Sequence, residues 1–489
     1  MKLNLFKMKK LSIFFFVLSM NCLAVNAQTT NSSPAVEERI KQVENSLCGW
    51  VQTGFDDQWN ILDRMKKYHV NGVSIAVIHD YKIEWAKGYG LADTSENRPV
   101  TEKTLFQAAS ISKSLNSLGV LKLVEQKKID CDSDINKYLK SWRFPYDSKS
   151  GGKKVTVRAL LSHTAGLSVH GFPGYERGKE IPTLIQVLNG EKPANTMAIK
   201  SIEEPGKRFN YSGGGTTILQ LLISDITGLP YEIYMQKEVL DPLGMNSSCY
   251  CQPPEGRSGL LATAYKADGK EVPGKYHVYP EMAAAGLWTN PTDLCKYVIE
   301  TELAWRGESK KVLSPEMTRM RLTTVIDDAA LGVFVNSRVT GSYKYFDHNG
   351  GNEGFSCTYY GCRDSGEGVA IMINSDSWTI IDEILNSVAS VYNWKDFYLP
   401  ESKKVVGVSE EQVMKYLGKY QMGMRRFEIV PDSKGLGIKS GDDTPWNLYF
   451  TSDSDCFAKE SRGMVTFRFS ADGKVNGFIT NGMRAKKLE

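Results

Sequence analysis

FQAASISKSLNSLGVL, residues 106–121, places Ser110 three positions before Lys113. On a helix, positions i and i+3 lie on one face with Cβ atoms about 5–6 Å apart, so a hydroxyl and an amine at this spacing can share a proton. Apolar residues recur at helical spacing after them: Leu115, Leu118, Leu121 and Val124. The pattern predicts a helix with Ser110 in its first turn, where free N–H groups and the helix dipole favour negative charge on an oxygen.

Spacing alone does not make Ser110 a nucleophile. A second Ser-x-x-Lys string runs from Ser150 to Lys153 within SKSGGKK, a polar glycine-rich loop that would not hold two side chains in register. A serine near a helix start is also commonly a cap. The short motif therefore leaves a cap and a nucleophile both open, and other parts of the chain have to decide.

Two further stretches carry the decision. RFNYSGGGTTILQLL, residues 208–222, sets Tyr211 before glycines and a helical pattern, and FDHNGGNEGF, residues 346–355, sets His348 and Gly350 before a strand. Ser110-Ile-Ser-Lys113, Tyr211-Ser-Gly213 and His348-Asn-Gly350 occur in this order. With them, and with LLSHTAGL from Leu160 and AAAGLWTNPTDL from Ala283, the sequence resembles the serine β-lactamase and penicillin-binding-protein superfamily. The resemblance extends roughly from Val36 to Trp394. It is strongest to the class C-like branch of β-lactamases, D,D-peptidases, D-amino-acid peptidases and esterases.

The resemblance implies a role for each motif. Ser110 would be the acylated nucleophile, Lys113 the base that poises it, and Tyr211 the relay of a proton to the leaving group. His348, Gly350 and Gly351 would belong to the substrate-binding strand, with the N–H groups of Ser110 and Gly351 forming an oxyanion hole. A serine hydroxyl needs such a base, and a lysine can act as one only if burial and a nearby cation lower its pKa.

Two departures from the β-lactamase pattern narrow the substrate. Gly213 stands where class C enzymes carry an asparagine, and His348 stands where they carry a lysine. The first departure removes a contact to the substrate's acylamino group, and the second replaces a fixed positive charge by a histidine that is mostly neutral at pH 7. We therefore expect weak or no β-lactamase activity, and an ester, an amide or a D-amino-acid peptide as substrate.

The leading hypothesis is an exported serine acyl hydrolase. One alternative is an acyltransferase that passes the acyl group to an alcohol such as a sterol-like molecule, since Gly213, Gly214 and Gly215 are expected to leave side-chain-free space beside Tyr211. Another is a non-catalytic sensor that binds a β-lactam or a peptide without turnover. A Ser-His triad using His163 or His170 is less favoured, because no Gly-x-Ser-x-Gly elbow surrounds Ser110. We expect His163 to fix a loop instead.

Strand patterns lie at both ends of the resembling region, around a helical middle. GVSIAVIHDYKIEWAKGYGLAD, residues 72–93, predicts a hairpin, and residues 355–362 and 367–376 predict two adjacent strands before a closing helix at 379–394. The expected fold is α+β in three layers (α/β/α), an antiparallel sheet flanked by helices with a helical subdomain. We expect this domain at 28–398, a linker at 399–408, and a small all-β sheet or barrel domain at 409–489, where short alternating runs follow one another.

The N-terminus is typical of an exported protein. Residues 1–27 combine lysines, an apolar run from Leu11 to Val25 and a small-residue exit at Ala27, which predicts a signal peptide cleaved there. The run is shorter than a transmembrane helix needs, and no later segment is long and apolar enough to span. The protein is thus expected in the periplasm or secreted; a lipid anchor at Cys22 is a weaker alternative, because Asn21 is bulky.

Charge and cysteine content exclude other classes. The formal charge is +4 and the signal peptide holds four lysines and no acid, so the mature chain is near neutral and offers no electrostatic case for nucleic acid. Eight cysteines would remain, and an oxidising compartment permits disulfides whose pairing the sequence does not reveal. No Cys or His spacing matches a zinc site. We expect no metal and no cofactor, and a small-molecule or peptide substrate as the partner.

Overall fold

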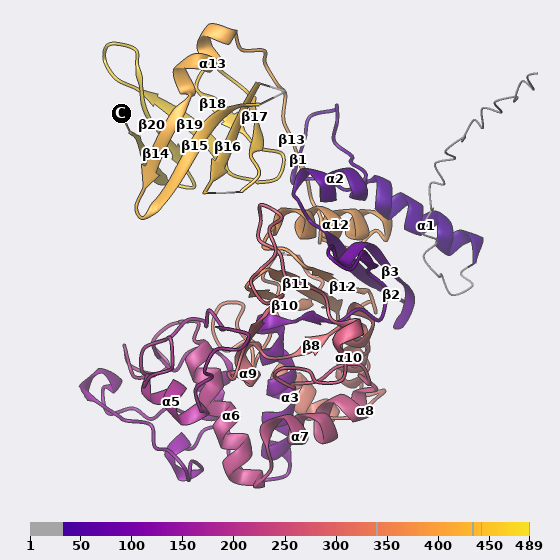
Figure 1. Ribbon diagram of the computed structural model, residues 1–489, viewed down its shortest axis with the longest axis vertical. Coiled ribbons are helices and arrows are strands. Elements are labelled where there is room, and N and C mark those ends of the chain that lie inside the picture. Colours follow the sequence, from indigo (N-terminus) through magenta and orange to yellow (C-terminus); the bar gives the residue numbers. More distant parts are fainter. Residues whose placement is uncertain (1–32, 339–340, 433–434, 442, 489) are drawn as a thin grey trace, which may run out of the picture.

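The computed structural model describes residues 33–338, 341–432, 435–441 and 443–488. The predicted signal peptide and Cys22 lie outside the described residues. Figure 1 shows a large domain of sheet and helices, with a separate barrel formed by the last part of the chain.

The core of the large domain is a seven-stranded sheet in the order β4-β3-β2-β12-β11-β10-β9. Its neighbours pair antiparallel, so the first and last strand groups of the domain meet in one sheet, as predicted. The strands are β2 Gly72–His79, β3 Lys82–Asp93, β4 Arg98–Pro99, β9 Phe334–Val335, β10 Tyr345–Asn352, β11 Phe355–Cys362 and β12 Gly368–Ile373. Asp80 and Tyr81 turn the predicted hairpin with positive φ angles of 52° and 61°, which a tight two-residue turn favours.

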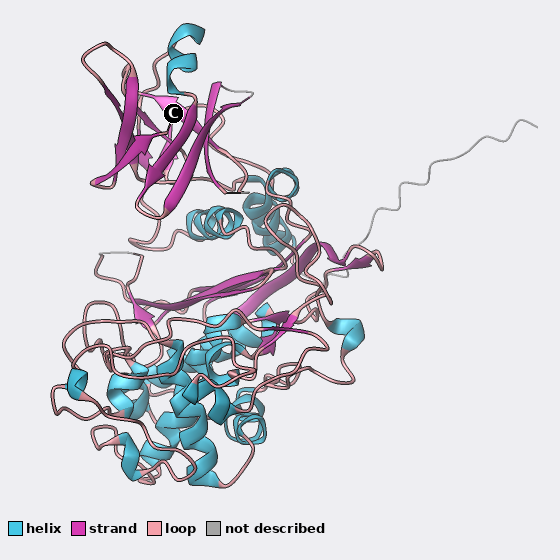
Figure 2. Cartoon of the chain, turned by 60° about the vertical axis from the view of Figure 1, so that its left-hand side comes forward, coloured by secondary structure: helices cyan, strands magenta, loops and turns pink. Residues whose placement is uncertain are grey.

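Helices cover both faces of the sheet, which explains why its central strands are almost continuously apolar. On β12, Ile371 packs with helices α1 Pro34–Asn45, α2 Ile61–Lys67 and α12 Thr379–Val391. Its neighbour Met372 points to the other face, into the core shared with α10 Pro291–Arg306. Figure 2 shows these helices above and below the sheet. The predicted α/β/α layering is confirmed.

The helical subdomain lies beyond the α10 face. Its helices are α3 Ser112–Glu125, α4 Val157–Leu161, α5 Leu184–Asn189, α6 Gly213–Thr227, α7 Tyr231–Met235, α8 Asp241–Leu243 and α9 Met282–Ala285, and α11 Pro315–Arg321 packs beside α10. Two short antiparallel pairs brace it, β5 Phe106–Gln107 with β8 Trp288–Thr289 and β6 Tyr175–Glu176 with β7 His277–Val278. Helix α3 packs against α6, α7, α9 and α11, so the start of α3 is held from several sides.

The C-terminal region is a closed barrel of eight strands. They are β14 Gly418–Met422, β15 Arg425–Asp432, β16 Gly435–Ser440, β17 Trp446–Phe450, β18 Asp455–Phe457, β19 Met464–Phe469, β20 Val475–Thr480 and β21 Met483–Lys487, preceded by helix α13 Glu410–Tyr416. The segment predicted as a linker is tied to the large domain, because its β13 Glu401–Ser402 pairs in parallel with β1 Val51–Gln52.

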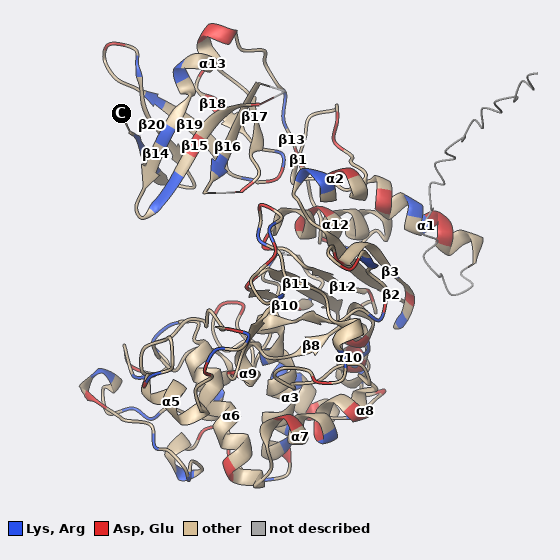
Figure 3. Ribbon diagram, viewed as in Figure 1, with Lys and Arg blue, Asp and Glu red and all other residues tan. Residues whose placement is uncertain are grey.

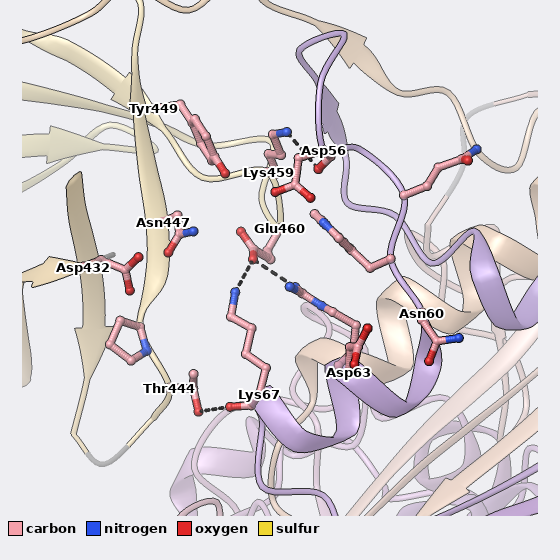
Figure 4. A pocket seen from close by; sticks show the side chains of 14 residues that line it. Asp56, Asn60, Asp63, Lys67, Asp432, Thr444, Asn447, Tyr449, Lys459 and Glu460 are labelled. Atoms are coloured by element: carbon pink, nitrogen blue, oxygen red, sulfur yellow. Dashed lines mark hydrogen bonds and ion pairs between the residues drawn. The ribbon is translucent and has the colours of Figure 1, made fainter. Parts of the chain in front are cut away.

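Ion pairs lock the barrel onto the large domain. The Arg64 guanidinium of α2 lies between the buried carboxylates of Glu383 and Glu460, and Lys67 Nζ lies 3.3 Å from Glu460 Oε1. Figure 4 shows Glu460 and Thr444 reaching Lys67 beside a polar pocket of about 490 Å³ at this junction. These contacts fix which side of the barrel faces the large domain.

All eight cysteines between Cys48 and Cys456 are free thiols in the described part of the chain. Among the same residues, no helix combines the length and the apolar character needed to cross a bilayer. Lys/Arg and Asp/Glu segments are interspersed over both domains in Figure 3.

Candidate active site

Ser110 lies at the sharp entry to α3. It occupies a 3-10 turn, Ala109–Ile111, directly before the helix, where the sequence predicted the first turn of the helix itself. The turn begins with Ala109, whose φ of 47° lies in the left-handed region that residues other than glycine rarely adopt. This tight turn presents Ser110 at the surface of the core, half-buried between the helical subdomain and the sheet.

Lys113 is buried beside Ser110. Its side chain is 4% exposed, and its Nζ lies 3.0 Å from Ser110 Oγ and donates to the carbonyl of Ala284 at 2.7 Å. Burial lowers the pKa of Lys113 to about 7, and no carboxylate pairs with it among the described residues. Of the two causes expected, burial and a nearby cation, burial is the one found. A substantial fraction of the Lys113 side chains is therefore neutral near pH 7.

The contact from Ala284 orients the amine. A neutral amine has two hydrogens and one lone pair, so a hydrogen committed to the Ala284 carbonyl helps to direct the lone pair towards Ser110. Gln220 of α6 holds α9, the helix that contains Ala284. Its side-chain oxygen accepts from Ala283 N at 2.9 Å, and its side-chain nitrogen donates to Pro280 O at 3.0 Å. The role of the Ala284 carbonyl was missed in the sequence, because any residue type can supply a backbone acceptor.

Tyr211 directly precedes Ser212, which caps α6 by accepting from Gly215 N at 3.0 Å. Burial raises the pKa of Tyr211, and a hydrogen bond with Ser110 opposes that shift. Lys113 Nζ lies 5.1 Å from the centroid of its ring. Tyr211 is therefore a neutral phenol at physiological pH, in contact with the nucleophile and close to the lysine.

Three histidines surround the Tyr211 ring. The ring of His163 stacks on it at 4.2 Å, and those of His170 and His348 lie at 4.9 and 6.3 Å. His163 Nδ1 accepts from Ser212 N at 3.2 Å, and burial followed by the charge of Lys113 lowers the pKa of His163 well below its usual value. It fixes the backbone after Tyr211, which agrees with the loop-fixing role predicted for it.

His348 is neutral and points into the site. It is 3% exposed, and burial, followed by the charge of Lys113, lowers its pKa to about 3. Its Nδ1 lies 2.7 Å from Asn349 O, so Nδ1 carries the proton and Nε2 is an acceptor. Nε2 is buried and has no hydrogen-bond partner within the described residues. The position that the resemblance fills with a cation in β-lactamases thus holds an uncharged ring.

Gly351 directs its peptide groups to the open edge of β10. Asn336 N donates to Tyr345 O, so the odd-numbered residues of β10 face the β9 side. Among the described residues, β9 pairs with Phe346 and Asp347 alone, and farther along this edge Gly351 is exposed. By alternation, the N–H and C=O of Gly351 both point away from β11. The geometry fits the oxyanion donor that the resemblance implies.

Gly350 serves a different purpose. A Cβ on Gly350 would lie 2.3 Å from the carbonyl oxygen of Ala108, two residues before Ser110. The missing side chain lets β10 cross directly against the segment that presents the nucleophile. Gly350 therefore sets the distance between strand and nucleophile, and its neighbour Gly351 supplies the outward N–H.

The expectation that Gly213, Gly214 and Gly215 leave open space beside Tyr211 is wrong. All three are buried, and a Cβ on them would meet, respectively, His170 O at 3.1 Å, Ile199 Cγ1 at 3.0 Å and Leu160 Cδ2 at 3.2 Å. The glycines allow the loop through His170 to pack tightly on the start of α6. The acyltransferase alternative thus loses the observation that motivated it.

Arg321 is a buried group that the sequence did not single out. It is fully buried, its Nε donates to Ser117 Oγ at 2.8 Å and its Nη2 donates to Ser114 O and to Tyr297 OH. It therefore holds the second turn of α3, directly after Lys113, from behind. An arginine in the polar sequence MTRMR gives no sign that it faces the core.

No group of three or more His, Cys, Asp or Glu side chains is positioned for a metal within the described ranges.

The sequence is similar to those of several known proteins. The sequence model of the Beta-lactamase family matches residues 60–386. Protein flp of Staphylococcus aureus (strain N315) is 26% identical over 235 residues, which are 47% of this chain and 43% of that protein. Teichoic acid D-alanine hydrolase of Staphylococcus aureus is 23% identical over 295 residues, 59% of this chain and 65% of that protein. The chain thus matches less than half of Protein flp's length.

Solved structures show the same fold at low sequence identity. The octameric penicillin-binding protein homologue from Pyrococcus abyssi superposes with a TM-score of 0.60 and 22% identity, covering 87% of this chain and 98% of that one. D-amino acid amidase from Ochrobactrum anthropi SV3 gives 0.56 and 20%, covering 72% and 99%.

Proposed function

The chain belongs to the beta-lactamase family, a family of serine hydrolases, and from this premise we propose that it is an exported serine acyl hydrolase that forms an acyl-enzyme on Ser110. One observation carries the proposal. Lys113 Nζ lies 3.0 Å from Ser110 Oγ, in surroundings that lower the pKa of Lys113 to about 7. A base with a pKa near the working pH combines a large neutral fraction with useful basicity.

Acylation would begin at the Ser110 hydroxyl. Neutral Lys113 takes the proton from Ser110 Oγ as the oxygen attacks the substrate carbonyl. Tyr211, whose pKa is raised, stays protonated and can donate to the leaving nitrogen or oxygen, with the proton on Lys113 replacing the one it gives. The bond to the leaving group breaks, and the acyl group remains as an ester on Ser110.

The carbonyl oxygen needs donors while it carries negative charge. The outward N–H of Gly351 at the open edge of β10 is suited to this, with the N–H of Ser110 as the second donor implied by the resemblance. Loss of one such donor typically costs roughly 3–4 kcal/mol of transition-state stabilisation. Water would then attack the acyl ester, passing a proton to Tyr211 as Tyr211 passes its own to neutral Lys113; the bond from the acyl carbon to Ser110 Oγ breaks, and Lys113 returns the proton to Ser110 Oγ.

The substrate we propose is an ester or amide of a D-amino acid, including D-amino-acid peptides. Support comes from the named activities of two similar proteins, a teichoic acid D-alanine hydrolase and a D-amino acid amidase. The neutral ring of His348 also supports it, because a β-lactam carboxylate would meet no fixed cation at that position. β-Lactamase activity is proposed to be weak or absent.

Export and location form part of the proposal. The signal-peptide pattern of residues 1–27 supports delivery to the periplasm or the outside of the cell. The sensor alternative predicts one acylation event per molecule, whereas a hydrolase turns over repeatedly.

The test is turnover of D-alanine p-nitrophenyl ester and D-alanine p-nitroanilide by purified protein. We expect many turnovers per molecule with at least one of them, a lower rate with the L-enantiomers, and none with Ser110→Ala. A single burst equal to the enzyme concentration would favour the sensor, and equal rates for wild type and Ser110→Ala would refute the proposed nucleophile.

A further inference from the structure

The barrel contains a cavity that opens towards the large domain. Its volume is about 420 Å³, within the range of roughly 300–1,000 Å³ that is usual for small-molecule sites. Inward-facing side chains from one end of the barrel form its apolar wall: Met422, Phe427, Ile438, Leu448 and Val465. In Figure 1 the barrel stands on the α12 side of the sheet.

The cavity exists because only one half of the barrel is filled. At the other end, Tyr416 of α13 packs on Phe467 with ring centroids 4.3 Å apart, and Tyr420 packs on Phe478 at 5.1 Å. All four rings are buried. The aromatic plug fills the end that carries α13, and the cavity lies at the end that faces the large domain.

A loop of the large domain forms the remaining wall. Residues Asp376 to Thr379, between β12 and α12, line the cavity, and Trp446 Nε1 of the barrel donates to Thr379 Oγ1 at 3.2 Å. Asp376 Oδ1 accepts from Gly354 N at 2.7 Å, which ties the same loop to the turn after β10. The cavity therefore borders the substrate-binding strand through this loop.

Trp378 joins the two sites. It lines the cavity, and a Cβ placed on Gly351 would lie 3.3 Å from its Cζ2 atom. Trp378 is 39% exposed, so its ring is accessible to a ligand. One side chain thus touches both the proposed oxyanion donor and the barrel cavity.

The direction of a bound acyl group follows from strand chemistry. A carbonyl that accepts from Gly351 N–H belongs to a residue whose own N–H can donate to Gly351 O, as in an antiparallel pair. The acyl side of the substrate then runs towards Asn352 and the β10–β11 turn, and the leaving group lies towards His348. The turn is where Asp376 and Trp378 begin the path to the barrel.

We propose, building on the acyl-hydrolase function above, that the barrel cavity binds the apolar distal part of the substrate's acyl group. The preferred substrate is an N-acylated or N-peptidylated D-amino-acid ester or amide whose extension is aliphatic or aromatic and long enough to pass Trp378. The apolar wall selects the extension. Arg425 and Lys439, on basic segments of β15 and β16 in Figure 3, line the same cavity and leave its rim polar.

Binding without catalysis is the first test. In the full-length Ser110→Ala protein, calorimetry compares N-octanoyl-D-alanine with N-acetyl-D-alanine. Burying several additional methylene groups is expected to lower the Kd of the octanoyl compound about 10- to 100-fold relative to the acetyl compound. Met483→Glu places a charge in the cavity wall at a side chain that is 51% exposed, and it is expected to remove this difference. Met424→Glu, the same change at a fully exposed position off the cavity, is expected to keep it.

Kinetics are the second test. With p-nitrophenyl esters of the same two compounds, wild type is expected to show a 10- to 100-fold lower KM for the octanoyl ester, and Met483→Glu is expected to abolish that preference. Ile438→Asn is a second cavity variant, and acetyl-ester turnover equal to wild type reports that each variant is folded. Equal affinity for the two acids, or a preference that survives both cavity variants, would overturn the cavity assignment. Absence of turnover with either ester would overturn the proposed function, while the calorimetry would still decide the cavity.

Discussion

Replacing Lys113 by methionine should abolish turnover. It should also stabilise the fold relative to wild type, and this gain should be larger at neutral pH than at alkaline pH. Lys113 is 4% exposed, and its pKa falls from 10.5 to about 7 in the folded chain. At about 1.4 kcal/mol per pH unit, keeping the ammonium form inside the fold costs about 5 kcal/mol relative to the neutral amine. Methionine has a similar length and no charge, so it escapes this cost.

The sign of the pH effect follows from proton binding. The folded pKa is below the unfolded one, so between them the unfolded chain binds more protons, and the stability contributed at Lys113 rises with pH across that window. Between pH 7 and pH 9, wild type should gain about 2 kcal/mol over Lys113→Met. Below pH 7, where both states hold the proton, the difference should be flat. Ionisations of groups that do not interact with Lys113 are common to the two proteins and cancel.

The assay is urea unfolding of both proteins at pH 6, 7, 8 and 9, followed by tryptophan fluorescence. Lys128→Met, at an exposed position just after α3, controls for the loss of one lysine. A wild-type minus Lys113→Met difference that stays constant from pH 6 to pH 9 would show that Lys113 is not desolvated as the structure indicates. The general-base role would then lose its physical basis.

Three further outcomes are expected. The kcat/KM for a D-alanine ester should rise with pH around a midpoint near 7, the pKa of Lys113, and His348→Gln should leave that midpoint in place, because His348 has a pKa of about 3; a midpoint that moves with this change would contradict the assignment. Tyr211→Phe should lower kcat at least about 100-fold by removing the proton relay, and a normal rate in stopped assays would exclude that role. Arg64→Leu should destabilise the protein by about 3–5 kcal/mol in urea unfolding, because it leaves the Glu383 carboxylate buried without its ion-pair partner and leaves Glu460 with Lys67 as its remaining one; an unchanged midpoint would show that this cluster does not secure the barrel.

Much of the fold could be predicted from sequence because its signals are local. The hairpin at Asp80 and Tyr81, the adjacent strands β11 and β12 and the closing helix α12 each have their own periodicity and turn residues. The eight-stranded barrel could be recognised only as a set of short alternating strands, since closure depends on pairing β14 with β21, far apart in the chain.

The parts of the site that depend on side-chain chemistry could be predicted from the sequence. The parts that depend on the position of backbone groups were missed. Ser110, Lys113, Tyr211 and His348 are unusual residue types in ordered motifs, and the structure brings them together. The carbonyl of Ala284, by contrast, belongs to an ordinary alanine, and its contact with Lys113 depends on how α9 packs on α3.

The glycines show the same limit. Gly213 to Gly215 and Gly350 to Gly351 look alike in sequence. Neighbouring segments occupy the space beside the first three glycines, while Gly351 faces an open edge. A missing side chain creates space only if no other chain segment occupies it, and that is decided by tertiary packing. Trp378 was overlooked for the same reason, because it is distant in sequence from every motif it borders.

The most direct test of the account is to find the acyl group on the protein. Wild type and Tyr211→Phe are mixed with N-acetyl-D-alanine p-nitrophenyl ester, quenched in acid within the first turnover, digested and mapped by mass spectrometry. If Ser110 is the nucleophile, we expect one added N-acetyl-D-alanyl group on the peptide that carries Ser110. This adduct should live longer in Tyr211→Phe and should be absent in Ser110→Ala. Turnover with no adduct on that peptide, or an adduct on another residue that persists in Ser110→Ala, would contradict it.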